Sequence, residues 1–271
     1  MKKILGSIAV LALAMPVGAQ AADLPAAAPA YKAPVMAPTP AYNWTGFYIG
    51  ASLGGEWESM DGSFANPTAT FPGESWGVSS SSRGMWDAHI GAQYQWSSVV
   101  FGVEGDFVGL FNHNNNSSSG ATCVTCIPAN GGIAGSFFAG NLHDHIWTIG
   151  GKLGWAFGPW MAYASGGFAS AKVDHALFTP GGVLIESTQT SHDGAYVGGG
   201  FDWQVWSTPG GALVAGIEYR HYWFQDVTAT PILANGLANN VDTWTIKPRA
   251  DTIEGKLSWL FNWGGPVVAR Y

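Results

Sequence analysis

Apolar and polar residues alternate along several segments of the chain, and segment 86–96 shows the pattern most clearly. One side of an extended backbone would carry Trp86, Ala88, Ile90, Ala92, Tyr94 and Trp96, and the other Asp87, His89, Gly91, Gln93 and Gln95. This period of two predicts a β-strand with one apolar face. Ten residues at about 3.3 Å each, tilted by about 40°, rise about 25 Å, the height of the apolar band on an outer-membrane barrel.

Eight segments show this alternation or come close to it: 44–57, 85–96, 99–111, 144–157, 160–173, 195–206, 212–224 and 252–261. Short turns join the second to the third, the fourth to the fifth and the sixth to the seventh, whereas the other connections run over a dozen residues or more. An even number of strands with alternating short and long connections predicts an all-β fold. We expect an eight-stranded, antiparallel, up-and-down transmembrane β-barrel with both termini in the periplasm.

Segment 160–173 fits this pattern least well. Met161 and Tyr163 fall on one side of the strand and Phe168 on the other. Either a bulge at Gly166-Gly167 corrects the alternation, or the phase assigned to this strand is wrong.

Tryptophan residues stand near both ends of the segments. The predicted topology puts one group near the periplasmic rim: Trp44, Trp96, Trp155, Trp160, Trp203, Trp206, Trp259 and Trp263. The other group, Trp57, Trp86, Trp147 and Trp223, is expected near the outer rim. Two such belts are typical of indole rings at lipid–water boundaries. In the alternative, a soluble β-sandwich, tryptophan is a core residue, but only 11% of residues are charged against about 25% in soluble domains.

The beginning of the chain predicts export. Residues 1–21 combine two lysines, a short apolar stretch and a small-residue cleavage site, as in a cleaved secretory signal peptide. Residues 22–42 are rich in alanine and proline and predict an extended periplasmic leader, which leaves 43–271 as the barrel domain. Removing Lys2 and Lys3 from 11 basic residues leaves 9 against 18 acidic ones, which argues against a nucleic-acid partner.

The lumen of the predicted barrel would carry charged residues. Eight strands enclose an interior that side chains just fill, so isolated charges there should pair. Counting from the periplasmic turns predicts two structural ion pairs, Glu104 with Lys152 and Glu218 with Lys256. The alternative is a narrow ion path, which should prefer cations because acids outnumber bases among the inward residues.

Two cysteines, Cys123 and Cys126, fall in the connection after the third strand and predict a local disulfide on the oxidising exterior. Zinc binding and redox chemistry are the alternatives, but no second ligand pair accompanies the cysteines. No nucleophile, histidine and carboxylate combine into a catalytic motif, so we expect no enzyme activity, no cofactor and no metal site.

Three stretches resemble a known family: residues 44–50 (WTGFYIG), 164–167 (ASGG) and the tail 261–271 (FNWGGPVVARY). Together they are similar to the outer-membrane immunogenic, or porin-family, proteins of α-proteobacteria, which are opacity-like eight-stranded barrels. The resemblance implies a surface-exposed protein of the outer membrane, inserted by the barrel-assembly machinery, with structural, antigenic or modest pore roles. Either Phe261 or Tyr271 would be the terminal aromatic residue read during insertion.

We therefore expect a monomer that supports envelope integrity and presents extracellular loops. Its partners would be outer-membrane lipid and lipopolysaccharide, together with periplasmic chaperones and the assembly machinery during biogenesis. A cation-leaning channel is the first alternative function, followed by an adhesin and, last, an outer-membrane lipid enzyme.

Overall fold

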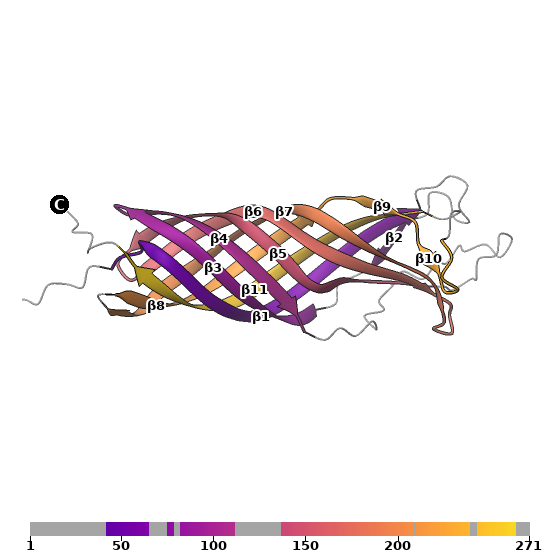
Figure 1. The fold of residues 1–271 in the computed structure, drawn as a ribbon, viewed down its shortest axis with the longest axis horizontal. Helices are drawn as coiled ribbons and strands as arrows, with labels where there is room; N and C mark the ends of the chain where they lie inside the picture. Colours follow the sequence, from indigo (N-terminus) through magenta and orange to yellow (C-terminus); the bar gives the residue numbers. More distant parts are fainter. Residues whose placement is uncertain are drawn as a thin grey trace, which may run out of the picture. The chain divides into compact units, whose positions relative to one another are not determined.

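The computed structural model describes residues 42–64, 75–78, 82–111, 137–208, 210–238 and 243–263. Its long strands are β1 (Gly46–Phe64), β3 (Ser82–Trp96), β4 (Val99–Leu110), β5 (Phe137–Phe157), β6 (Trp160–Phe178), β7 (Leu184–Thr208), β8 (Gly211–Phe224) and β11 (Trp244–Asn262). Three short strands are β2 (Ser75–Val78), β9 (Val227–Ala229) and β10 (Ile232–Leu233). Each predicted segment overlaps one long strand. Figure 1 shows these strands wrapping obliquely around a common axis.

The eight long strands close into a ring. They follow one another in the order β1, β3, β4, β5, β6, β7, β8 and β11, and β1 pairs with β11 from Gly46↔Asn262 to Phe64↔Trp244. Every pairing is antiparallel. This closure confirms the predicted eight-stranded antiparallel barrel, in which no long strand is left with an open edge.

Tight turns close the hairpins at one end of the barrel. Ser97 in the turn between β3 and β4 has φ 57°, and Gly158 between β5 and β6 has φ 67°. Two-residue hairpins require such left-handed positions because their twist then matches that of the strands. No helix in the described ranges is long and apolar enough to cross a membrane.

At the other end, several strands run further than the sequence pattern indicated. Strands β6 and β7 are joined by residues 179–183 alone, so the prediction of a long fifth-to-sixth connection was wrong. Part of the last long connection forms strands as well, because β9 pairs with β11 and β10 with β7. The labels of β2, β9 and β10 gather at this end in Figure 1.

The exterior of the barrel is apolar between its two ends. Alternate residues on the strands are exposed, among them Ile49 at 54%, Leu53 at 66% and Ile90 at 63%. On β6, Phe168 is exposed while Met161 and Tyr163 are buried, and the register past Gly166-Gly167 is regular. Of the two alternatives, the bulge is therefore excluded, and the phase assigned to this strand was wrong.

Tryptophans mark both ends of the apolar exterior, with one exception. Exposed tryptophans at the outer end are Trp57, Trp86, Trp147 and Trp223, and at the turn end Trp96, Trp155, Trp160, Trp203, Trp206 and Trp263. Trp259, also predicted for the turn end, is half-buried, and its ring centre lies 6.0 Å from that of Trp206. Trp44 was also expected in the lower belt, but it is fully buried and its indole N–H donates to the Gly158 carbonyl at 3.5 Å. This indole therefore seals the interior instead of facing lipid.

The lumen contains two apolar clusters. Near the tight turns lie Trp44, Tyr48, Val100, Ala156, Met161, Tyr163, Ala212, Val214 and Leu260. The cluster nearer the outer end includes Met60, Met85, Val108, Leu142, Ile146, Val173, Tyr196, Tyr222, Phe224, Trp244 and Ile246. Along β4 the order is Val100, Glu104, Asp106, Val108, so a charged layer separates the two.

Candidate functional site: the lumen charge cluster

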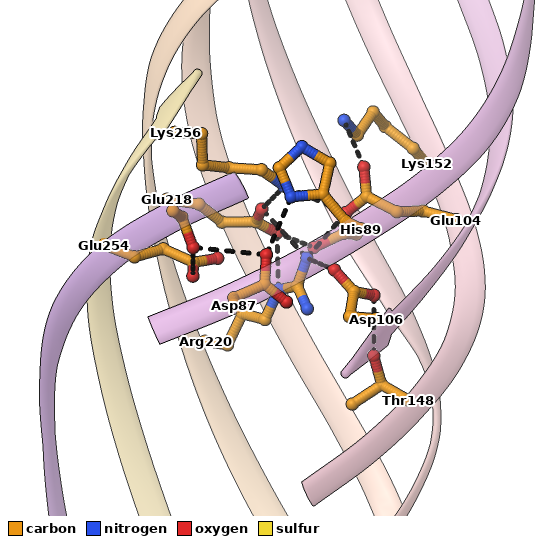
Figure 2. Close-up of polar contacts among 12 residues, drawn as sticks. Asp87, His89, Glu104, Asp106, Thr148, Lys152, Glu218, Arg220, Glu254 and Lys256 are labelled. Atoms are coloured by element: carbon orange, nitrogen blue, oxygen red, sulfur yellow. Dashed lines mark hydrogen bonds and ion pairs between the residues drawn. The ribbon is translucent and has the colours of Figure 1, made fainter. Parts of the chain in front are cut away.

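The charged layer consists of inward-facing residues from six strands, which we call the lumen charge cluster. Its members are Asp87, His89, Glu104, Asp106, Lys152, Asp202, Glu218, Arg220, Glu254 and Lys256, all of them buried. The strand period of two places them inside, because residues at i and i+2 share one face of a strand. Figure 2 shows most of these side chains converging on the barrel axis.

Glu104 is the hub of the cluster. Its Oε1 lies 2.7 Å from Arg220 Nη2 and 2.9 Å from Lys256 Nζ. Its Oε2 accepts from Lys152 Nζ at 3.1 Å and from the Tyr48 hydroxyl at 2.8 Å. One carboxylate thus joins strands β1, β4, β5, β8 and β11 through charge-assisted hydrogen bonds, which are stronger than neutral ones.

Arg220 crosses the lumen from β8 to β4. Its guanidinium contacts Glu104, Asp106 at 3.0 Å and, on its own strand, Glu218 at 2.9 Å. In the ring order these two strands lie opposite each other, with three strands between them on either side. Figure 2 shows the guanidinium between the carboxylates of both walls.

The predicted ion-pair partners lie close together. Lys152 Nζ is 3.1 Å from Glu104 Oε2, and Lys256 Nζ is 2.7 Å from Glu218 Oε2. Lys152 also lies 3.8 Å from Asp202. Because Lys256 contacts Glu104 as well, the two expected pairs form one connected network and not two separate ties.

The Ser52 hydroxyl lies between two acids of the cluster. Ser52 Oγ lies 2.5 Å from Glu254 Oε2 and 3.2 Å from Asp87 Oδ1. The same Asp87 oxygen is 2.7 Å from His89 Nδ1, and His89 Nε2 is 2.8 Å from Ser258 Oγ. These contacts connect β1, β3 and β11.

Aromatic rings cover the cations of the cluster. Lys152 Nζ lies 4.3 Å from the centre of the Tyr163 ring and 5.1 Å from that of Tyr48, and the Arg220 guanidinium carbon lies 5.1 Å from that of Tyr196. Desolvated cation–π contacts of this kind contribute about 2 kcal/mol. The apolar clusters therefore stabilise the charges that they enclose.

Some ionic contacts were not predicted from the sequence. Arg83 lies 3.0 Å from Glu58 and 3.4 Å from Glu56 in the outer part of the lumen. The alternation of apolar and polar residues continues upstream of Met85 and would have placed Arg83 in the lumen, but the strand was predicted to begin at Met85. On the exterior, His221 Nδ1 lies 2.6 Å from Asp251 Oδ1, a cross-strand pair that sequence neighbours do not reveal.

One small cavity lies beside the cluster. A cavity of about 20 Å³ is lined by Lys152, Asp202, Lys256 and Ser258 together with apolar neighbours that include Trp44. One water molecule needs about 10–15 Å³ by this measure. The cavity thus has room for a single water. The predicted disulfide of Cys123 and Cys126 lies outside the described residues.

Comparison with known proteins identifies the architecture. Residues 7–261 match the family described as outer membrane protein beta-barrel domain. Curated proteins gave no match. Among solved structures, Neisserial surface protein A is similar at 15% identity and a TM-score of 0.33, over 80% of this chain and 98% of that chain.

Two further solved structures are also similar. OprG from Pseudomonas aeruginosa is 10% identical, with a TM-score of 0.40 over 80% of this chain and 97% of that chain. The outer membrane protease OmpT from Escherichia coli is 7% identical, with a TM-score of 0.43 over 80% and 97%. At these identities the similarity concerns the fold alone.

Proposed function

Because this chain belongs to the outer membrane protein β-barrel family, we propose that it is a structural, surface-exposed protein of the cell outer membrane. In this proposal the barrel supports the integrity of the envelope, presents its outer connections to the exterior and catalyses no reaction. The observation that supports a structural role best is the packing of the lumen.

Three successive layers fill the described lumen. The apolar cluster near the tight turns is followed by the lumen charge cluster and then by the outer apolar cluster. Arg220 links opposite walls through contacts of 2.7 Å to Glu104 and 3.0 Å to Asp106. Conduction would need these buried contacts to break, and removing one partner of a buried ion pair costs about 3–5 kcal/mol.

Single-channel recording in a planar bilayer tests this proposal. Refolded protein should insert without steady openings. A matched pair of variants shows whether packing is the cause: Tyr163→Ala, which removes a buried ring, should produce openings, whereas Trp160→Ala, which removes an exposed one, should not. Steady openings of the unmodified protein would overturn the proposal.

A narrow, cation-leaning channel is the second candidate, and one observation favours it. The lumen charge cluster contains six carboxylates (Asp87, Glu104, Asp106, Asp202, Glu218, Glu254) against the three permanent cations Lys152, Arg220 and Lys256. If the protein conducts, a salt gradient should give a reversal potential that favours cations. Anion preference would exclude this second candidate.

Lipopolysaccharide is the partner that we propose for the outer part of the barrel exterior. Arg249 and Lys247 are exposed on β11 just beyond Asp251, and Arg249 pairs with Trp223 of the outer belt. Cations at this height would meet the phosphates of the outer leaflet. Arg249→Ala should weaken co-purification with lipopolysaccharide, and unchanged lipid content would contradict this assignment.

Biogenesis completes the proposal. We propose that residues 1–21 are removed as a signal peptide, that periplasmic chaperones deliver the chain, and that the barrel-assembly machinery inserts it as a monomer of the α-proteobacterial immunogenic subtype. Phe261, exposed on β11, is available as an insertion signal. The intact mass of the mature protein tests the cleavage site.

An adhesin role for the outer connections has its own test. Deleting residues 112–140 would then abolish binding to host cells.

A further inference from the structure

Asp87, His89 and Asp106 occupy neighbouring positions on one face of two paired strands. Asp87 and His89 are two residues apart on β3, and His89 lies directly opposite Asp106 on β4. One possible ligand atom from each of the three lies within 4.8 Å of the other two. All three side chains are buried, and Figure 2 labels them within the lumen.

Asp87 has bonding capacity that the described residues do not use. The residue is 1% exposed, yet its Oδ2 has no hydrogen-bond partner among them. Its Oδ1 is the oxygen that faces His89 and Ser52. A buried carboxylate oxygen without a partner is costly, so a further positive charge or donor is expected beside it.

Charge balance in the cluster points the same way. Its six carboxyl groups face three permanent cations, which leaves three carboxyl groups without a permanent counter-charge in a buried space. Ser52 has one hydroxyl proton but contacts both Glu254 and Asp87, so it cannot donate to both at once. A dication here would compensate two of the surplus carboxylates, beside a hydroxyl whose single proton reaches only one of its two acids.

We propose that Asp87, His89 and Asp106 form a binding site for a divalent transition-metal ion, with zinc as the best fit. Imidazole together with carboxylate oxygens suits zinc, whereas magnesium and calcium prefer oxygen ligands alone. Asp106 also contacts Arg220 and Thr148, but two carboxylate oxygens offer about four lone-pair sites and can still bind a metal. The ion would tie β3 to β4 at the centre of the barrel.

The experiment uses the full mature chain refolded in detergent, stripped with a chelator and titrated with zinc chloride. Calorimetry and elemental analysis should find tight binding of about one ion per chain. His89→Gln and Asp87→Asn should abolish it. His221→Gln is the matched control, because His221 and Asp251 form the exterior histidine–carboxylate pair, and this variant should bind like the parent.

Three results would overturn the proposal: no tight binding by the unmodified protein, binding unchanged in His89→Gln and Asp87→Asn, or binding lost in His221→Gln. Heat-modifiability on gels establishes that each variant has folded. X-ray absorption of the zinc-loaded unmodified protein gives a test that needs no variant. One imidazole and no sulfur ligand are expected, whereas sulfur ligands would assign the ion to Cys123 and Cys126 and refute the lumen site. These measurements do not depend on whether the protein conducts in a planar bilayer. The metal site and the structural role can therefore be refuted independently of each other.

Discussion

Replacing Glu104 by glutamine removes the hub of the lumen charge cluster while keeping its shape. The carboxylate accepts from Arg220, Lys256, Lys152 and Tyr48 at 2.7–3.1 Å. The amide oxygen of glutamine serves the donors on one side only, and its NH₂ group points at the donors on the other. Two charge-assisted bonds at about 1.5–3 kcal/mol each are then lost. A buried pair that loses a partner costs about 3–5 kcal/mol, and we expect Glu104→Gln to fall in that range.

Urea unfolding in lipid vesicles, followed by tryptophan fluorescence, measures this free energy. The control is Asp226→Asn, whose carboxylate lies 3.0 Å from Lys247 with both side chains about half exposed. Such a surface pair contributes about 0–1 kcal/mol. Adding Lys152→Met to Glu104→Gln should cost less than Lys152→Met alone, with a coupling of about 0.5–3 kcal/mol. The reasoning fails if Glu104→Gln costs no more than the control or if the two changes are additive.

Three further changes test the lumen, the lipid-facing surface and the outer end by the same unfolding assay. Gly91→Ala should cost about 1–3 kcal/mol, because the added Cβ would lie 2.3 Å from the Tyr48 ring. In the control Gly105→Ala the added Cβ meets nothing closer than 3.7 Å, so this variant should be neutral. Equal effects of the two changes would contradict the packing. Ile90→Arg places a charge on the apolar exterior and should cost about 2–4 kcal/mol. The control Ser59→Arg lies near the outer belt and should cost about 0–1 kcal/mol. A larger cost for Ser59→Arg than for Ile90→Arg would argue against lipid contact. His175 lies on β6 five residues beyond Ser170, the partner of Trp147 in the outer belt, and burial lowers the pKa of its imidazole to about 3. The unfolded chain therefore takes up this proton first, so stability should fall as the pH drops from about 6.5 towards 3, and His175→Gln should reduce that fall; an unchanged pH dependence would show that another group is responsible.

The exterior of the barrel could be predicted because lipid imposes a simple rule on it. Every residue between the belts that faces acyl chains must be apolar, so the period of two is visible in the sequence. The interior obeys no such rule. Met161 and Tyr163 are as apolar as lipid-facing residues but pack inside, and this similarity led to the wrong phase for β6. Trp44 was misplaced for the same reason.

The lumen charges could be assigned to the inside, but their contacts needed the register. Counting from the turns paired Glu104 with Lys152, whereas the residue opposite Glu104 is Gly150 and the one opposite Lys152 is Gly102. The long lysine side chain spans this offset of two residues. In the same way, Glu218 lies opposite Glu254, and Lys256 reaches it from two positions along β11. Shorter side chains at the same distances from the turns would not have reached each other.

Contacts across the lumen were beyond the reach of the sequence pattern. Alternation tells which face a residue occupies, and distance from a turn gives its height, but the direction across the barrel depends on strand number and shear together. Arg220 meets Glu104 from the opposite wall for this reason, although 116 positions separate them. Since the same guanidinium holds both walls and occupies the axis, widening the lumen must break the contacts that stabilise the barrel. Closure of the lumen and stability of the fold therefore depend on the same residues, so a variant that opens the lumen by removing Arg220 should also unfold at lower urea.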